Sequence, residues 1–352
     1  AKTVFAVAIA ISLLSSTTFA QVAPRDYLFN DAHFHLTNYI QEGISIRDFL
    51  KVMGNKAGRV ALFGIPLQQQ WSYRVDENRG PTYYLNSDSP LYYYSFTDAW
   101  IATAYQSLSQ EERARFDPMI TGFNPTDMYA ADHIRRVLTA FPGVFSGIGE
   151  FSIHKEFVSA KIAGDVASLQ DQALDRLIDF ATEVGLVVLI HNDVDVPFAK
   201  PGADPAYAAQ MKALFRRHPD TTFIWAHIGV GRIIRPVKEQ AAIVEEIIND
   251  PKLRNVHFDI SWDEVAKYVV ATPESTKTAA AMVNRYPDRF LFGTDEVAPA
   301  NQEKYLKVYN QYEPFWNLLT REASEKVRKG NYERIFDQAR RKVRTWEGAH
   351  VN

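Results

Sequence analysis

Residues 186–191 read Leu-Val-Val-Leu-Ile-His, a continuous apolar run that ends in a histidine, and residues 222–227 read Thr-Phe-Ile-Trp-Ala-His. Between these runs, residues 206–217 carry apolar side chains at helical spacing. Two short apolar runs joined by a helix are typical of a βαβ unit, whose strands are parallel and buried. This part of the chain therefore predicts a parallel sheet covered by helices.

The same alternation extends over most of the chain. Six further apolar runs span residues 27–34, 59–63, 118–123, 144–150, 256–260 and 290–293. Helical patterns occupy residues 45–55, 98–108, 127–139, 168–183, 236–248 and 272–286, and a helical tail follows from Asn301. No linker rich in Gly, Ser or Pro divides the chain. Eight strands alternating with helices predict an α/β fold, a single-domain (β/α)8 barrel of the TIM type.

The composition limits the classes of protein and of partner. The 352 residues are 46% hydrophobic and 13% aromatic, which excludes a disordered chain. A formal net charge of -3 without a basic stripe disfavours nucleic acid, so we expect a small-molecule substrate. The chain has no cysteine, and any metal must therefore be bound by His, Asp or Glu. The composition is compatible with a homo-oligomer as well as with a monomer.

Residues 1–20 have the layout of a secretory signal peptide. A lysine precedes the apolar residues 4–14, a Ser/Thr stretch follows, and the small Ala20 offers a cleavage point. The apolar run is shorter than the roughly 20 residues of a membrane span. We therefore expect a mature barrel of residues 21–352 that is secreted or periplasmic, with an uncleaved N-terminal membrane anchor as the alternative.

Residues 64–98, after the second predicted strand, form a long irregular loop rich in aromatic side chains. Loops that follow barrel strands surround the active site. We expect this loop to form a wall or lid of the substrate site, and surface packing or a dimer contact is the alternative. The aromatic residues are Trp71, Tyr73, Tyr83, Tyr84, Tyr92, Tyr93, Tyr94 and Phe96.

Metal-ligand residue types stand at the ends of five predicted strands. The first strand ends in Asp31-Ala32-His33-Phe34-His35, and alternate side chains on a strand share a face, so His33 and His35 can hold one ion. The C-terminal ends of barrel strands meet on one face. We therefore expect one pocket to contain His33, His35, Glu150, His191, His227 and Asp295.

This ordered set resembles that of the amidohydrolase superfamily, in particular its amidohydrolase-related branch, with a secondary likeness to TatD-type deoxyribonucleases. The likeness covers nearly the whole predicted barrel, and residues 330–336, Gly-Asn-Tyr-Glu-Arg-Ile-Phe, are similar to the C-terminal helix of that branch. It implies a metal-dependent enzyme. The metal ligands that it implies are His33, His35, Glu150, His191 and Asp295.

Glu150 departs from the pattern of those members that carry a carboxylated lysine after strand four. Lys155 lies too far beyond the predicted strand to replace that lysine. A glutamate there resembles the bridging carboxylate of TatD-type enzymes, so we expect one or two ions and favour two. For one ion, the resemblance implies a neighbourhood of His33, His35, His191 and Asp295, with Glu150 and His227 supporting them.

The residue types also indicate the chemistry. Imidazole and carboxylate ligands favour Zn²⁺, which lowers the pKa of bound water from about 15.7 to about 7. Asp295 is the expected general base, and His227 is expected to polarise the scissile bond or to bind a second ion. The candidate substrate contacts are Arg232, Asn192, His154 and Trp262, each of which also has a purely structural alternative.

These features predict a metal-dependent hydrolase that uses activated water to cleave an ester, lactone, amide or related bond of a small molecule. The alternative is a metal-dependent decarboxylase of an aromatic or unsaturated carboxylic acid, because the branch also contains such enzymes. A TatD-like nuclease is a third reading that the charge of -3 weakens. A non-catalytic binding protein on a barrel scaffold is the fourth.

Overall fold

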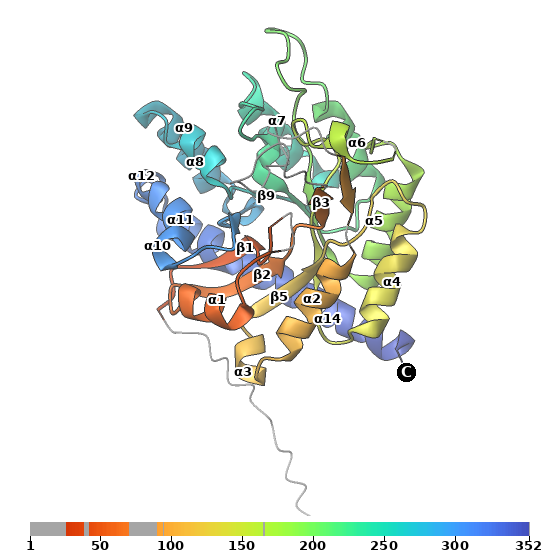
Figure 1. Cartoon of the computed structure of the whole chain (residues 1–352). Helices are drawn as coiled ribbons and strands as arrows, with labels where there is room; N and C mark the ends of the chain where they lie inside the picture. Colours follow the sequence, from red (N-terminus) through yellow and green to blue (C-terminus); the bar gives the residue numbers. More distant parts are fainter. Residues whose placement is uncertain (1–25, 39–41, 70–89, 94, 165, 352) are drawn as a thin grey trace, which may run out of the picture.

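The structure is a computed structural model that describes residues 26–38, 42–69, 90–93, 95–164 and 166–351 (Figure 1). Its centre is a nine-stranded sheet in the order β10-β9-β8-β7-β6-β5-β2-β1-β11, with helices around it. Every predicted strand is present. The strands are β1 (Phe29–His35), β2 (Ala57–Phe63), β5 (Phe116–Ile120), β6 (Gly147–Ser152), β7 (Val187–His191), β8 (Phe223–Trp225), β9 (Val256–Asp259), β10 (Phe290–Leu291) and β11 (Glu296–Val297).

The sheet closes on itself through two short strands, β10 within the eighth predicted strand and β11 just after it. β10 pairs with β9, and β11 pairs with β1, both in parallel. Between these two strands, the Ala32 amide donates to the Phe292 carbonyl at 3.1 Å, and the Asp295 amide donates to the His33 carbonyl at 2.8 Å. The predicted single-domain (β/α)8 barrel is therefore confirmed.

The connecting helices also agree with the predicted ones. They are α1 (Ile46–Met53), α2 (Phe96–Gln106), α4 (Ala130–Ala140), α5 (Gln172–Val184), α6 (Ala208–Arg217), α7 (Gln240–Asn249) and α9 (Pro273–Arg285). Local sequence sets several of their starts: the Thr272 hydroxyl accepts from the Ser275 amide, and Pro273 occupies the first helical position of α9. Short additional helices are α3 (Gln110–Arg113), α8 (Asp263–Val269), α10 (Gln302–Tyr305), α11 (Lys307–Gln311), α12 (Glu313–Trp316) and α13 (Arg321–Glu325).

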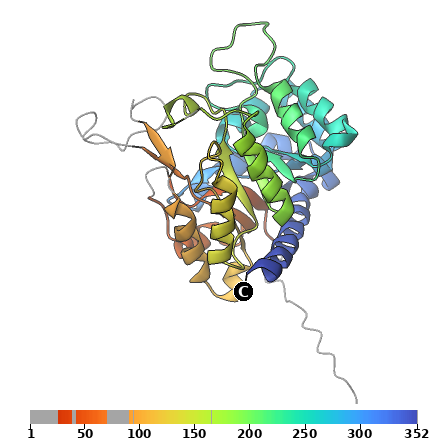
Figure 2. The ribbon, with the colours of Figure 1, turned by 90° about the vertical axis from the view of Figure 1, so that its right-hand side faces the viewer.

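The C-terminal helix α14 (Asn331–His350) closes one end of the barrel (Figure 2). Tyr332 and Phe336 of this helix pack with the apolar side chains that fill the barrel, such as Met119 and Ile224. The Tyr332 hydroxyl donates at 2.7 Å to Asp117, which lies near the start of β5. Helix α14 therefore covers the N-terminal ends of the strands and leaves the C-terminal ends for the site.

Most predicted strand boundaries differ from the observed ones by one to three residues, and one of these differences concerns a site residue. The sixth strand was expected to reach His227, but β8 ends at Trp225. The chain leaves the sheet there in a tight turn, η2 (Ala226–Gly229), in which His227 and Ile228 have left-handed backbones with φ of 56° and 53°. This turn carries His227 away from the sheet ladder.

The loop after β2 contains a hairpin of β3 (Leu67–Gln69) and β4 (Leu91–Tyr93). Of the predicted aromatic residues, Trp71, Tyr73, Tyr83, Tyr84 and Tyr94 lie outside the described residues, as does the predicted signal peptide, residues 1–20. The signal peptide stays a prediction. In the part of the chain that the structure describes, no helix is both long and apolar enough to span a membrane.

Candidate active site

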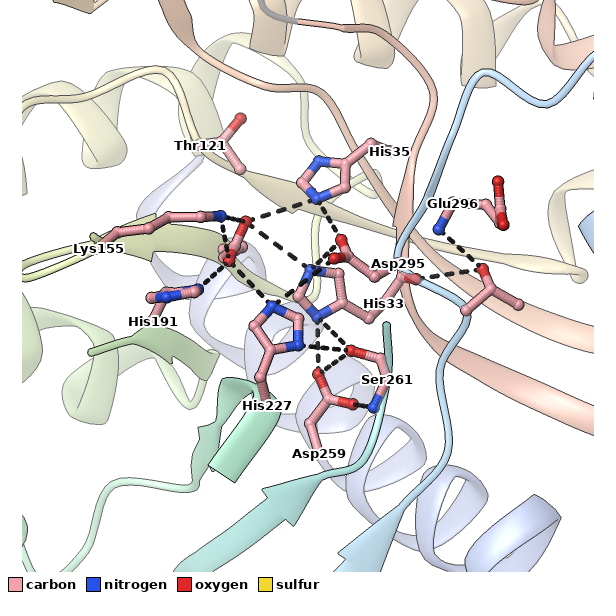
Figure 3. A network of polar contacts seen from close by, with 12 residues as sticks. His33, His35, Thr121, Lys155, His191, His227, Asp259, Ser261, Asp295 and Glu296 are labelled. Atoms are coloured by element: carbon pink, nitrogen blue, oxygen red, sulfur yellow. Dashed lines mark hydrogen bonds and ion pairs between the residues drawn. The ribbon is translucent and has the colours of Figure 1, made fainter. Parts of the chain in front are cut away.

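The structure brings the predicted ligand residues together at the C-terminal end of the barrel (Figure 3). Each comes from a different strand end, apart from the His33 and His35 pair on β1. The four histidines of the site are buried, and the side chain of Asp295 is 11% exposed. The remaining members come from β6 (Glu150), β7 (His191), the turn after β8 (His227) and the segment between β10 and β11 (Asp295).

Left-handed backbone turns aim some of these side chains inward. His227 has φ 56°, Asp295 has φ 52°, and Trp262, beside His227, has φ 80°. Such a conformation costs a residue with a side chain roughly 1–3 kcal/mol and persists only where surrounding bonds hold it. The left-handed backbone of Asp295 is held by the preceding residue, Thr294, whose amide and hydroxyl donate to Asp31 at 2.9 and 2.7 Å.

The ligand atoms form two sets that share Glu150. In the first set, Asp295 Oδ1 lies 3.2 Å from His33 Nε2 and 3.1 Å from His35 Nε2, and Glu150 Oε2 lies 3.8 and 3.5 Å from the same nitrogens. In the second set, Glu150 Oε1 lies 2.6 Å from His191 Nδ1 and 3.4 Å from His227 Nε2. Within each set the ligand atoms all lie within 4.8 Å of one another.

These sets fit a divalent cation. His33 Nε2 and His227 Nε2 are buried without a hydrogen-bond partner among the described residues, although carboxylate oxygens lie close to both. An unpaired buried nitrogen is costly, and a cation between it and the carboxylates removes that cost. Imidazole and carboxylate groups together are ligands of divalent ions such as Zn²⁺.

The charges of the site keep both carboxylates ionised. Burial alone would raise the pKa of Asp295, but the neighbouring His33 and His35 hold it well below its usual range. Burial would likewise raise the pKa of Glu150, but Lys155 and His191 lower it well below its usual range. Each carboxylate is therefore negatively charged at neutral pH and available to a cation.

A pocket of about 220 Å³ opens onto the site. His35, Glu150 and Asp295 form its polar floor. Aromatic walls come from Tyr93 and Phe151, together with Trp262. The pocket also contains two cationic side chains, Lys155 and Arg232.

Of the four predicted substrate contacts, Arg232 and Trp262 line this pocket. The Arg232 side chain is 49% exposed and its Nε lies 3.5 Å from Glu264, while the Trp262 ring lies 5.0 Å from the His227 ring. Asn192 and His154 are not among the described residues that line the pocket. The Asn192 side chain donates to the Asp193 carbonyl at 2.8 Å, and the His154 ring stacks on Tyr207 at 3.9 Å.

Three residues at the site were not predicted to lie there. Lys155 was set aside because of its distance along the chain from Glu150, but its Nζ lies 3.0 and 3.2 Å from the two Glu150 oxygens. The chain turns back directly after β6, which returns Lys155 to the strand end. Asp259 lies at the end of β9, so the strand-end rule that identified the other carboxylates could have identified it as well. Ser261 had no comparable signal.

Comparison with known proteins agrees with this geometry. The model of the amidohydrolase family matches residues 31–338. Among solved structures, an amidohydrolase from Burkholderia multivorans with bound Zn has a TM-score of 0.56 at 12% identity, over 88% of this chain and 99% of that one. Comparison with curated proteins found no significant match.

Two other similar structures differ in the reaction that their names state. A probable 2-pyrone-4,6-dicarboxylic acid hydrolase from Acinetobacter baumannii, with citric acid bound, has a TM-score of 0.51 at 12% identity, over 88% and 99% of the two chains. A 2,6-dihydroxybenzoate decarboxylase, in complex with 2,6-dihydroxybenzoate, has a TM-score of 0.50 at 13% identity, over 89% and 99%. At such identities the likeness shows the fold alone. The family match spans nearly the whole barrel, and the chain therefore belongs to the amidohydrolase family.

Proposed function

We propose that this protein is a metal-dependent hydrolase that cleaves an ester, lactone, amide or related bond in a small anionic molecule. The supporting observation is the position of Glu150, whose two oxygens face different sets of ligand atoms. One carboxylate placed in this way can join two divalent ions. A pair of ions suits hydrolysis because it stabilises both the attacking and the leaving oxygen.

Each residue has a defined part in the proposed reaction. Bound divalent ions would lower the pKa of water to about 7 and so supply a nucleophile near neutral pH. Asp295 is held ionised at the floor of the pocket, where its carboxylate can accept the proton of the attacking water and pass it to the leaving group. His227 Nε2 lies 3.7 Å from Asp295 Oδ2, where it could hold a second ion beside that carboxylate.

The pocket walls support an anionic and partly apolar substrate. Lys155 Nζ lies above the Trp262 ring at 5.9 Å, and Arg232 lines the same pocket. A guanidinium binds a carboxylate through two parallel hydrogen bonds, and an aromatic face packs against a ring or an unsaturated chain. The volume of about 220 Å³ favours a substrate of roughly one ring.

Decarboxylation is the second candidate, and the same walls favour it. Tyr93, Phe151 and Trp262 surround a site that also contains cationic side chains, which is an environment for an aromatic acid. In that reaction the carboxylate leaves as carbon dioxide and a proton takes its place on the ring. A 2,6-dihydroxybenzoate decarboxylase shares the fold, so the fold is compatible with this reaction.

The test is metal analysis of the purified protein alongside Glu150→Gln, with Glu156→Gln as the matched control. Glu156 is a buried carboxylate that accepts from the Ile233 amide at 2.8 Å and belongs to neither set of ligand atoms. We expect two equivalents of metal in the wild type and in the control, one in Glu150→Gln, and acid release from esters or lactones. One equivalent unchanged in Glu150→Gln, with carbon dioxide release, supports the second candidate. Turnover by metal-free protein overturns both.

A further inference from the structure

Asp259 and Ser261 lie directly behind the site and join two of its histidines. His33 Nδ1 lies 2.7 Å from Asp259 Oδ2, and His227 Nδ1 lies 3.1 Å from Ser261 Oγ. Ser261 Oγ in turn donates to Asp259 Oδ2 at 2.8 Å. The network therefore links β9 to β1 and to the turn after β8 (Figure 3).

We propose that Asp259 and Ser261 are positioning residues that keep a hydrogen on Nδ1 of His33 and of His227, so that the Nε2 of each ring is left to face Glu150 and Asp295 and to bind a cation. The hydrogen-bond geometry is independent of the proposed function, whereas the role of these nitrogens in binding a cation rests on it. Both residues are fully buried, and neither is among the described residues that line the pocket.

The direction of each hydrogen bond follows from donor counting. A carboxylate only accepts, so the hydrogen between Asp259 and His33 belongs to His33 Nδ1. A hydroxyl has a single hydrogen, and Ser261 gives it to Asp259. Ser261 Oγ can then only accept from His227, whose Nδ1 must carry a hydrogen. The backbone amide of Ser261, at 2.6 Å from Asp259 Oδ1, fixes which way the carboxylate faces.

This assignment explains why His227 Nε2 has no hydrogen-bond partner among the described residues. A neutral imidazole with its hydrogen on Nδ1 has a bare Nε2, and His227 Nε2 lies 3.4 Å from Glu150 Oε1 and 3.7 Å from Asp295 Oδ2. A lone pair facing carboxylate oxygens is repulsive. Without Ser261 the hydrogen would move to Nε2, donate to Glu150 and remove the lone pair that a cation needs.

The tautomers can be measured without any metal. The probe is metal-free protein with ¹⁵N-labelled histidine at pH 8, observed by long-range ¹H–¹⁵N NMR. We expect His227 to carry its hydrogen on Nδ1 in the wild type and in Ser261→Thr, and on Nε2 in Ser261→Ala. Asp259→Asn gives a second test with little change of shape. Its amide would donate to Ser261, Ser261 would donate to His227 Nδ1, and the hydrogen of His227 would again move to Nε2.

Zn²⁺ affinity, measured by competition with a chelator, gives the functional readout. Ser261→Ala and Asp259→Asn should weaken binding by about 10–100-fold, whereas Ser261→Thr should bind like the wild type. Asp98→Asn is the matched control, because Asp98 is a buried carboxylate of helix α2 that accepts from the backbone amides of Thr121 and Gly122 at 2.8 and 2.9 Å.

The outcomes separate this inference from the proposed function. Retention of the Nδ1 hydrogen on His227 in both Ser261→Ala and Asp259→Asn overturns the inference. If the hydrogen shifts to Nε2 in the variants but the wild type binds no Zn²⁺ or other divalent ion, the tautomer assignment is supported and the metal-dependent function is overturned. A shift to Nε2 with weakened Zn²⁺ binding supports both.

Discussion

Replacement of His257 by glutamine should reduce the loss of stability that the protein suffers in acid. His257 lies on β9 and is 6% exposed, in register with Ile224, whose side chain belongs to the barrel interior. Burial, together with the positive charges of Arg334 and Arg289, lowers the pKa of His257 to about 3. The folded protein therefore keeps this imidazole neutral down to strongly acidic pH.

The magnitude follows from the difference between the folded and unfolded pKa values. The unfolded imidazole takes up a proton below about 6.5, whereas the folded one does so only near 3, so stability falls as the pH drops through this window. At about 1.36 kcal/mol per pH unit, the loss has a limit of about 5 kcal/mol, and about 2 kcal/mol of it is reached at pH 5. Above about pH 6.5 this contribution is fully present.

Urea unfolding followed by circular dichroism at pH 8 and pH 5 measures the effect. The wild type should lose about 2 kcal/mol more than His257→Gln between these two conditions. His350→Gln, at the exposed end of α14, is the control and should behave like the wild type. Equal losses in the wild type and in His257→Gln would refute the assignment of a neutral buried imidazole.

Three other changes test separate parts of the structure. Asp117→Ala should lower the free energy of unfolding in urea by about 3–5 kcal/mol, because the buried guanidinium of Arg59, 2.9 Å away, loses one of its two carboxylates, and Arg340 and the Tyr332 hydroxyl lose theirs. A loss under about 1 kcal/mol contradicts this. Gly149→Ala should lower both Tm and metal content, because the new Cβ would lie 2.7 Å from the Phe63 ring and displace the strand before Glu150. Wild-type Tm and metal content would show that β6 accommodates the methyl group without moving. Lys155→Met should raise Zn²⁺ affinity by about tenfold or more, because it removes a buried positive charge beside Glu150. Weaker Zn²⁺ binding would show that the metal site requires the lysine.

The barrel was predictable because its signals are local. Each buried strand is a short apolar run, and each connecting helix has its own periodicity and capping residues, such as Thr272 and Pro273 at the start of α9. The ends of parallel strands meet on one face of a barrel, so residue types at those ends were enough to group His33, His191 and Asp295.

The strand-end rule failed where the chain reverses or where a loop carries its side chains elsewhere. Lys155 returns to Glu150 after a turn, although five positions separate the two in the sequence. His154, next to Lys155, stacks on Tyr207 and is not among the described residues that line the pocket. Distance along the chain is a poor guide in such loops, since their paths depend on packing between neighbouring strands.

The sequence by itself determined the barrel, the residues at its strand ends and hence the types of ligand atom available to a cation. Only the tertiary structure decided how these atoms are arranged: which oxygen of Glu150 faces which histidine, and how Asp259 and Ser261 connect His33 with His227. The reason is physical. These relations depend on left-handed turns at His227 and Asp295 and on ångström distances between strands far apart in the chain, which periodicity and residue type do not encode.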